Sequence, residues 1–172
     1  MTQPLNTQQY HSDLIVEHAE NGWRIVRLNR PKSLHALDLS IVKALREVFE
    51  DLHHDDTVKA IWLDSTTPKA FCAGGDLRFT YDKWLRHDDA TLADFFREEY
   101  QLNRRIFHYP KPYIALINGI TLGGGCGISV HGARVIAGET LQLAMPETKI
   151  GLYPDVGASY FLARTPNRIG MY

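Results

Sequence analysis

The stretch of sequence that decides the fold reads Asn118-Gly119-Ile120-Thr121-Leu122-Gly123-Gly124-Gly125-Cys126-Gly127. It follows an apolar run at residues 113–117, which predicts a strand, and the glycines then predict a short helix as far as about His131. Glycines at a helix start leave bare backbone N–H groups that face whatever lies above the first turn. This region is therefore expected to present hydrogen-bond donors to a bound group.

A second glycine-containing loop reads Phe71-Cys72-Ala73-Gly74-Gly75-Asp76 and comes soon after another predicted strand, residues 58–63. If the two strands are neighbours in one sheet, their carboxyl ends bring the N–H groups of Gly75 and Gly124 together. Such a pair forms an oxyanion hole, in which each donor contributes about 3 kcal/mol of transition-state stabilisation. The alternative is that the glycines only allow tight turns and close packing, which is the simpler interpretation for either loop alone. The glycine run lacks the Lys-Ser/Thr pair of a phosphate-binding loop and does not fit a dinucleotide-binding motif.

The remaining segments alternate between predicted strands and helices. Asn21-Gly22 is a hairpin signal, and Asp38 is a plausible N-cap before apolar residues at helical spacing. The elements expected on these grounds are strands over residues 14–17, 23–28, 134–137 and 141–143, and helices over about 38–52 and 91–107. The alternation predicts an α/β fold, and 172 residues of which 44% are hydrophobic are enough for one domain.

The last residues indicate an interrupted element. Thr165-Pro166 is typical of a helix start, yet only six residues follow Pro166. We therefore expect residues 1–172 to be a single domain that is truncated at its C-terminal end, with a helical C-terminal part absent.

Composition argues against several classes of partner and site. A formal net charge of −1, from 19 basic and 20 acidic side chains, gives no basic field for nucleic acid or an anionic membrane. No apolar run approaches the ~20 residues of a membrane span, and the polar N-terminus does not have the pattern of a signal peptide. Cys72 and Cys126 are too few for a disulfide framework, so we expect packing roles in a reduced, cytoplasmic setting. His53-His54-Asp55-Asp56 fits a solvated helix end better than a metal site, and no metal is predicted.

Two acidic residues, Glu147 and Asp155, each follow a proline beyond the glycine run. A carboxylate partly desolvated beside Met145 and Pro146 is expected to have a raised pKa, which suits a base. The alternatives are a surface salt bridge for Glu147 and, for Asp155, capping of a helix that begins near Val156. Positioned acids beside exposed amide donors are what acyl-transfer chemistry requires.

Three segments resemble the crotonase (enoyl-CoA hydratase/isomerase) superfamily: Lys69-Ala70-Phe71-Cys72-Ala73-Gly74-Gly75-Asp76-Leu77, the stretch from Asn118 to Cys126, and Leu28-Asn29-Arg30-Pro31 before His35-Ala36-Leu37. The resemblance covers nearly the whole chain, from about residue 14 to residue 172. It implies a crotonase (Clp-protease-like) fold, which is a spiral of ββα units. It also implies that the amides of Gly75 and Gly124 hold a thioester oxygen and that the third segment lines the CoA site.

Within this superfamily the acidic residues indicate a subfamily. Enoyl-CoA hydratases carry one glutamate directly after the glycine segment, where this chain has Gly127, and a second that corresponds to Glu147. Glu147 together with Asp155, and Ser129-Val130-His131-Gly132 before them, resembles the 3-hydroxyisobutyryl-CoA hydrolases, which cleave a CoA thioester in valine breakdown. The implied catalytic residues are Glu147, as base or nucleophile, and Asp155, which holds the substrate's 3-hydroxyl or positions Glu147.

The resemblance also implies the substrate contacts. The residues expected to bind substrate or CoA are Arg30, Lys32, Ala36, Ala73, Gly74, Asp76 and Gly123, of which Arg30 and Lys32 could meet CoA phosphates. CoA is part of the substrate, so no cofactor is expected. The expected partners are an acyl-CoA and, for a full-length protein, copies of itself. Two alternatives remain open: an enoyl-CoA hydratase or isomerase that uses Glu147 alone, and an inactive fragment or CoA-binding scaffold.

Overall fold

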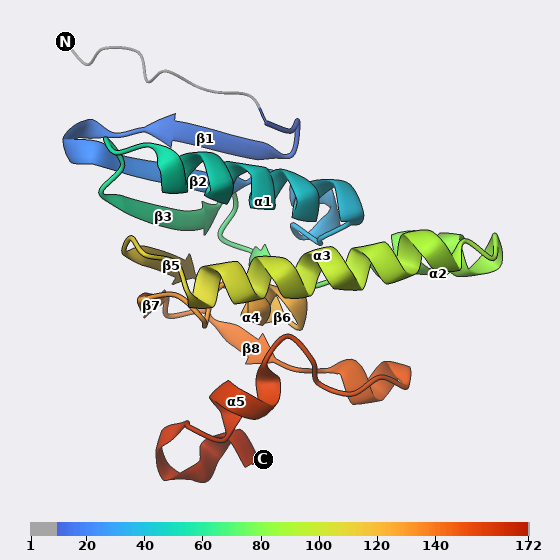
Figure 1. Ribbon diagram of the computed structural model, residues 1–172. Coiled ribbons are helices and arrows are strands. Elements are labelled where there is room, and N and C mark those ends of the chain that lie inside the picture. The colour runs from blue at the N-terminus through green and yellow to red at the C-terminus, as the bar shows by residue number, and fades with distance from the viewer. Residues whose placement is uncertain (1–9, 172) are drawn as a thin grey trace.

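The computed structural model describes residues 10–171. Pairs of strands, each followed by helical segments, succeed one another along the chain (Figure 1). In chain order the elements are β1 Leu14–His18, η1 Glu20–Gly22, β2 Trp23–Leu28, η2 Pro31–Ser33, α1 Leu39–His54, β3 Ala60–Ser65, β4 Ala70–Cys72, α2 Leu77–Leu85, α3 Asp89–Phe107, β5 Tyr113–Ile117, β6 Ile120–Leu122, α4 Gly124–Gly127, β7 Arg134–Ala137, β8 Gln142–Ala144, η3 Glu147–Ile150, α5 Ala158–Leu162 and η4 Pro166–Met171.

The strand pairs build two sheets. One sheet has five strands in the order β1-β2-β3-β5-β7, and the other has three in the order β4-β6-β8. β1 and β2 pair antiparallel, whereas the other pairings of the described strands are parallel. From β3 onward, the first strand of each pair joins the large sheet and the second joins the small one. The predicted α/β class and the spiral of ββα units are thus confirmed.

Local sequence signals set the first ββα unit. Asn21 and Gly22 take positive φ angles of 67° and 82° between β1 and β2, a conformation that asparagine and glycine tolerate best. Asp38 caps α1 as predicted, because its carboxylate accepts hydrogen bonds from the amides of Ser40 and Ile41.

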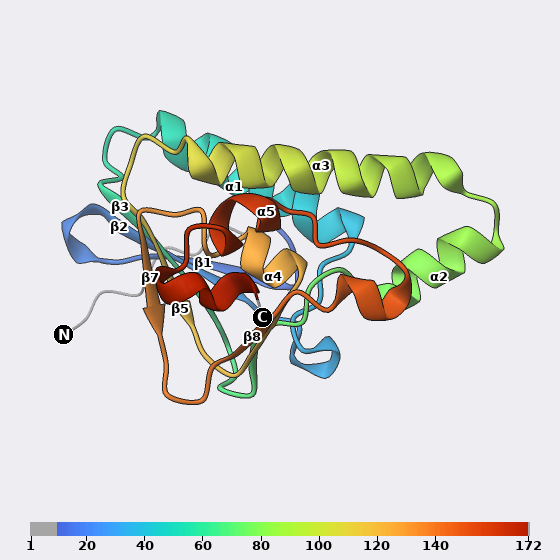
Figure 2. The same ribbon diagram turned by 90° about the horizontal axis from the view of Figure 1, so that it is seen from below.

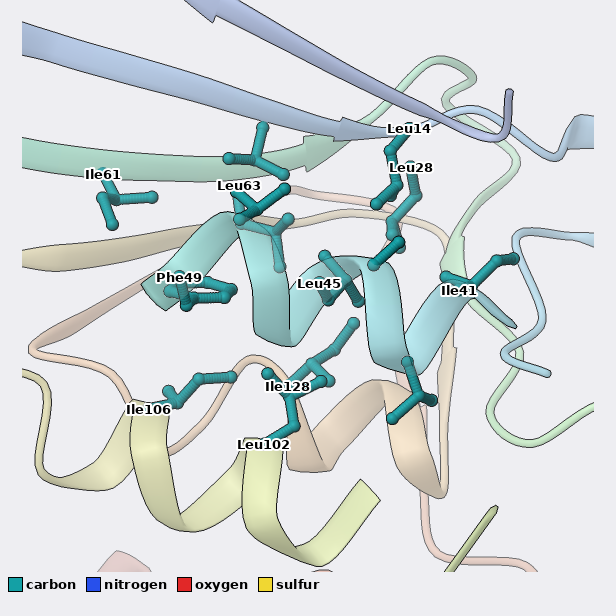
Figure 3. Close-up of a cluster of buried hydrophobic side chains, with 14 of the residues drawn as sticks. Leu14, Leu28, Ile41, Leu45, Phe49, Ile61, Leu63, Leu102, Ile106 and Ile128 are labelled. Atoms are coloured by element: carbon teal, nitrogen blue, oxygen red, sulfur yellow. The ribbon is translucent and has the colours of Figure 1, made fainter. Parts of the chain in front are cut away.

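The hydrophobic core lies between the large sheet, α1 and α3 (Figure 3). Leu45 and Phe49 of α1 pack in the same cluster as Leu63 of β3 and Leu102 of α3. Burial of each such side chain contributes about 1.5–3 kcal/mol relative to exposure. Ile128, directly after α4, belongs to this cluster, so the glycine-rich helix is anchored to the core.

α3 packs along α1 and turns Phe95, Leu102 and Ile106 inward at helical spacing. α2 lies beyond the N-terminal end of α3 (Figure 2) and leaves Tyr81 and Trp84 on its surface, each 60% exposed. The sequence does not predict α2, since its large apolar residues do not mark a buried face.

Two three-residue strands also escape prediction. The sequence indicates a loop where β4 forms and gives no strand signal where β6 forms. Neither segment is long enough to show a period, and their ladder exists only because the chain folds them side by side. The helical turn η4 begins at Pro166, as Thr165-Pro166 predicts. Among the helices of residues 10–171, none combines the length and apolarity that a bilayer span needs.

Candidate active site

The loop of residues 73–76 is hydrogen-bonded along its length to residues 34–37. The Ala73 amide donates to the Leu34 carbonyl over 3.0 Å, and the Asp76 amide donates to the Leu37 carbonyl over 2.7 Å. Gly75 lies between them, and its N–H has no acceptor within residues 10–171. The loop therefore offers one unused donor where it borders a cavity.

The second glycine loop faces the first at close range. Gly124 is the first residue of α4, so its N–H has no partner inside the helix. A Cβ added to Gly124 would lie 3.5 Å from the Gly75 nitrogen, and one added to Gly74 would lie 3.3 Å from the Gly124 nitrogen. β3 and β5 are neighbours as predicted, but β4 and β6 are the strands that lead directly into these loops.

Both loops border a cavity of about 320 Å³. Most of its wall is apolar, and three carboxyl groups interrupt that wall. Its lining residues are Ala73, Gly74, Gly75, Leu77, Thr80, Phe95, Phe96, Glu99, Leu122, Gly123, Gly124, Pro146, Glu147, Lys149, Ile150, Leu152 and Asp155. An apolar cleft with a few convergent polar groups is typical of a small-molecule site. The structure thus brings the two predicted catalytic acids and both predicted amide donors to one cavity.

Glu147 begins η3 and is only 8% exposed. Its Oε2 is buried with no hydrogen-bond partner among the described residues, and its Oε1 lies 2.5 Å from where a Cβ on Gly123 would be. Burial raises the pKa of Glu147 and the charge of Asp155 adds to the rise, whereas its own backbone amide lowers the pKa. A buried carboxyl with an unused oxygen beside the glycine loop is suited to accept a proton or to attack a carbonyl.

Glu99 is a site residue that the sequence reasoning missed. It is 3% exposed on α3, and a Cβ on Gly124 would collide with its Oε1. Burial, followed by the charges of Asp155 and Glu147, raises the pKa of Glu99 to about 8. Its position on the apolar stripe of α3, four residues after Phe95, is the signal that could have revealed it.

Asp155 is half-buried between α3 and α5. Its Oδ2 accepts a 2.6 Å hydrogen bond from the Tyr100 hydroxyl. It does not cap α5, whose N-cap is Gly157 and has no side-chain hydrogen bond. The His131 Nε2 lies 2.7 Å from the Val156 carbonyl, to which it can only donate, so His131 helps to hold the turn that carries Asp155.

Gly127 has no room for a side chain. A Cβ there would lie 2.8 Å from the Val156 Cβ and 2.9 Å from the Asn103 Oδ1. Asn103 is 6% exposed, and both polar atoms of its side chain lack a partner among the described residues. The glutamate that a hydratase carries at this position is therefore absent, and its space is occupied.

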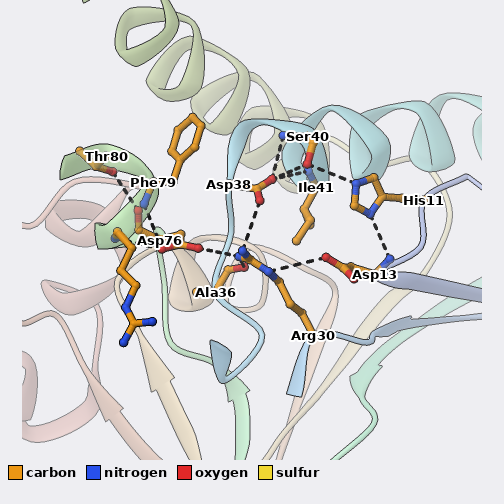
Figure 4. A network of polar contacts seen from close by, with 11 residues as sticks. His11, Asp13, Arg30, Ala36, Asp38, Ser40, Ile41, Asp76, Phe79 and Thr80 are labelled. Atoms are coloured by element: carbon orange, nitrogen blue, oxygen red, sulfur yellow. Dashed lines mark hydrogen bonds and ion pairs between the residues drawn. The ribbon is translucent and has the colours of Figure 1, made fainter. Parts of the chain in front are cut away.

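The residues predicted to bind substrate or CoA divide into two groups. Ala73, Gly74 and Gly123 line the cavity. Arg30, Lys32, Ala36 and Asp76 do not: Lys32 is exposed on η2, whereas the other three take part in one polar network (Figure 4).

The two cysteines and His35 have packing roles in this region. Burial raises the pKa of the Cys72 and Cys126 thiols to about 12, so neither is a nucleophile at neutral pH. His35 is buried and accepts the Arg30 amide at Nδ1, and burial lowers its pKa.

The profile of the enoyl-CoA hydratase/isomerase family matches residues 23–172. The chain belongs to this family, the crotonases. Among its relatives, the "3-hydroxyisobutyryl-CoA hydrolase, mitochondrial" of Xenopus tropicalis is 47% identical over 148 residues, which make up 86% of this chain and 38% of the relative. The human protein of the same name is 43% identical over 148 residues, with the same coverage. The chain thus spans about two-fifths of the length of these crotonases.

Solved crotonases share the fold. A carnitinyl-CoA dehydratase from Mycobacterium thermoresistibile superposes with a TM-score of 0.87 at 37% identity, over 94% of this chain and 47% of that one. An enoyl-CoA hydratase from Rhodobacter sphaeroides gives a TM-score of 0.87 at 40% identity, over 92% and 47% of the two chains. The crotonase fold is therefore established for the described part of the chain.

Proposed function

We propose that the protein hydrolyses a CoA thioester, with 3-hydroxyisobutyryl-CoA as the substrate and 3-hydroxyisobutyrate and CoA as the products. One observation carries the proposal: the unused amides of Gly75 and Gly124 border the same apolar cavity as the buried carboxyl of Glu147. The names of the relatives that are 43–47% identical support the choice of substrate.

In the proposed reaction the thioester oxygen lies between the two amides. They stabilise the negative charge that develops when the carbonyl carbon becomes tetrahedral. Glu147 acts in one of two ways. As a base, it takes a proton from water while the water oxygen attacks the carbonyl carbon; the tetrahedral intermediate then expels the CoA thiolate, which takes up the proton from Glu147. As a nucleophile, it attacks directly, expels the CoA thiolate and forms an anhydride that water then cleaves.

The other two carboxyl groups have distinct proposed roles. Asp155 accepts a hydrogen bond from the substrate's 3-hydroxyl through the oxygen that Tyr100 leaves free, or it orients Glu147. Glu99, with a pKa of about 8, is mostly protonated at neutral pH and can donate a hydrogen bond beside Gly124. Glu99 thereby supplies a hydrogen-bond donor to the cavity that also contains the carboxyl groups of Glu147 and Asp155.

The wider setting follows from this proposal. CoA enters as part of the substrate, so the reaction needs no separate cofactor, and the full-length protein forms homo-oligomers. With this substrate, the proposed place of the reaction is in valine breakdown. We retain a cytoplasmic location as a prediction, although the vertebrate relatives carry "mitochondrial" in their names.

Thiol release tests the proposal directly. The protein, expressed from its complete reading frame, is incubated with 3-hydroxyisobutyryl-CoA while a thiol reagent reports free CoA. Rapid thiol release is expected, together with poor loss of enoyl absorbance when crotonyl-CoA is supplied. No thiol release above the spontaneous rate would overturn the proposal.

Hydration of an enoyl-CoA is the second candidate, favoured by the names of the structural neighbours. It requires Glu147 to act without a second acid at position 127, where Asn103 and Val156 fill the space. Hydration of crotonyl-CoA that greatly exceeds thiol release would select this function. If the folded protein bound CoA but catalysed neither reaction, it would instead be a non-catalytic scaffold.

A further inference from the structure

Arg30 is the centre of an ion-pair network that lies outside the cavity (Figure 4). Its Nη1 donates to Asp76 Oδ2 over 2.7 Å and to the Ala36 carbonyl over 3.0 Å. Its Nη2 and Nε lie 3.6 Å from carboxylate oxygens of Asp38 and Asp13. One guanidinium thus faces three carboxylates, and the network carries an excess of negative charge.

The network joins the starts of two helices. Asp76 uses Oδ1 to accept the amides of Arg78 and Phe79 at the start of α2, and Asp38 uses Oδ1 in the same way on α1. The second oxygen of each carboxylate faces Arg30. Both aspartates are therefore fixed by a helix on one side and by Arg30 on the other.

This arrangement reaches Gly75 through its immediate neighbour. Asp76 follows Gly75 in the chain, and the Asp76 amide donates to the Leu37 carbonyl. Arg30 also binds the carbonyl of Ala36, next to Leu37, so it holds both segments that form the ladder around Gly75. The Gly75 N–H belongs to the Gly74–Gly75 peptide, whose carbonyl accepts the Leu37 amide over 2.8 Å, so a rotation of that peptide would turn the N–H away from the cavity.

We propose that Arg30 is a positioning residue that fixes the direction of the Gly75 N–H by holding Asp76 and Ala36 together. This role rests on the proposed function, in which that amide binds the thioester oxygen. It differs from a contact with a CoA phosphate, because a phosphate that approached Arg30 would meet the excess negative charge of Asp13, Asp38 and Asp76.

Arg30→Gln and Arg30→Lys are the test variants, and Arg27→Gln is the matched control. Arg27 also bridges two carboxylates, those of Glu17 and Asp64, but it does not contact residues 34–37 or 73–76. Arg30→Lys keeps the charge but lacks the planar guanidinium, which lets one group bind both Asp76 and Ala36. It should therefore retain only part of the kcat and of the protection from exchange. It also provides the comparison if glutamine prevents folding.

Two readouts are needed. Amide hydrogen exchange at Leu37 and Asp76 should become about tenfold faster in Arg30→Gln, as expected when a local ladder opens more readily, and should stay unchanged in Arg27→Gln. The kcat for thiol release should fall about tenfold with KM little changed, because a small misplacement of a reacting group lowers the rate.

The outcomes separate the possible roles. A higher KM with normal kcat would assign Arg30 to CoA binding and overturn the proposal. Unchanged exchange at residues 37 and 76, or faster exchange with normal kcat, would also overturn it. If the unaltered protein released no thiol, the proposed function would fall, while the exchange data would still show whether Arg30 holds this loop.

Discussion

The donor side and the acid side of the cavity are held in place by different means. The amides of Gly75 and Gly124 belong to loops that are bonded to residues 34–37 or packed into the core. The acids Glu147 and Asp155 lie on η3 and a turn, where Ile150 is 51% and Tyr153 is 73% exposed. Oxyanion stabilisation depends on geometry that is set before substrate arrives, so it suits the rigid side. Changes on the donor side should therefore reduce stability as well as activity, whereas changes on the acid side should reduce mainly activity.

The largest expected effect is that of Glu147→Gln on the acid side. If Glu147 is the base or nucleophile, kcat should fall by about 100-fold to 10,000-fold, the range that acid–base catalysis contributes. Thermal unfolding should change little, since glutamine keeps the shape. Thiol release measures the rate, and Glu139→Gln, which alters an exposed residue outside the cavity, is the control. A rate close to normal would remove Glu147 from the mechanism.

A stability comparison of two glycines tests the donor side. A Cβ on Gly125 would collide with the Cys72 carbonyl and lie 2.9 Å from the Cys72 Cβ, so Gly125→Ala should lower the free energy of unfolding by about 3 kcal/mol. Gly151, on the acid side, has nothing within 4 Å of an added Cβ. Gly151→Ala should cost only about 1 kcal/mol for its positive φ. Urea unfolding measures the free energy of unfolding of both variants. Equal losses in the two would contradict the claim that the donor side is the more tightly packed.

Glu99 links the two sides, and its protonation should appear in the pH dependence of stability. The folded protein retains a proton on Glu99 up to a pKa of about 8, whereas the unfolded chain loses it near the usual value of 4.5. The folded state therefore binds more protons between these values, and its free energy of unfolding should fall as pH rises from 5 to 8. Glu99→Gln should reduce this fall by at least about 1 kcal/mol in urea unfolding. The same slope in both proteins would show that Glu99 ionises normally.

The smallest expected effect belongs to Asp155→Asn. Loss of one hydrogen bond to the 3-hydroxyl should lower kcat/KM about fivefold. The loss should shrink on a CoA thioester that lacks this hydroxyl, because the partner group is then missing. Steady-state kinetics on the two substrates measure the difference. Equal losses would assign Asp155 to the orientation of Glu147.

The sequence predicts those parts of the fold whose signals are local. β5 has the predicted bounds because a short apolar run lies between Pro112 and Asn118. α1 begins where Asp38 caps it. β4 and β6 could not be predicted, since three-residue strands owe their existence to a ladder between distant segments.

The site was predictable where its residues form part of a motif. The sequence predicts Gly75, Gly124, Glu147 and Asp155 as site residues, and all four border the cavity. Glu99 belongs to no motif, and its place on the apolar stripe of α3, four residues after Phe95, is the one local sign of its burial. A basic residue in a loop, such as Arg30, suggests that an anionic ligand binds there. The actual partners of Arg30 could not be predicted, because the carboxylates that surround it come from several distant segments of the chain.

The most direct measurement is the infrared carbonyl frequency of a carbon-13-labelled 3-hydroxyisobutyryl-CoA bound to the Glu147→Gln protein. Donation from Gly75 and Gly124 should weaken the carbonyl bond and shift its stretch to a lower frequency than in water. The same shift should persist when Asp155→Asn is added, because the donor side is set independently of the acids. A bound carbonyl that absorbs at its frequency in water would show that the two amides do not hold the thioester oxygen.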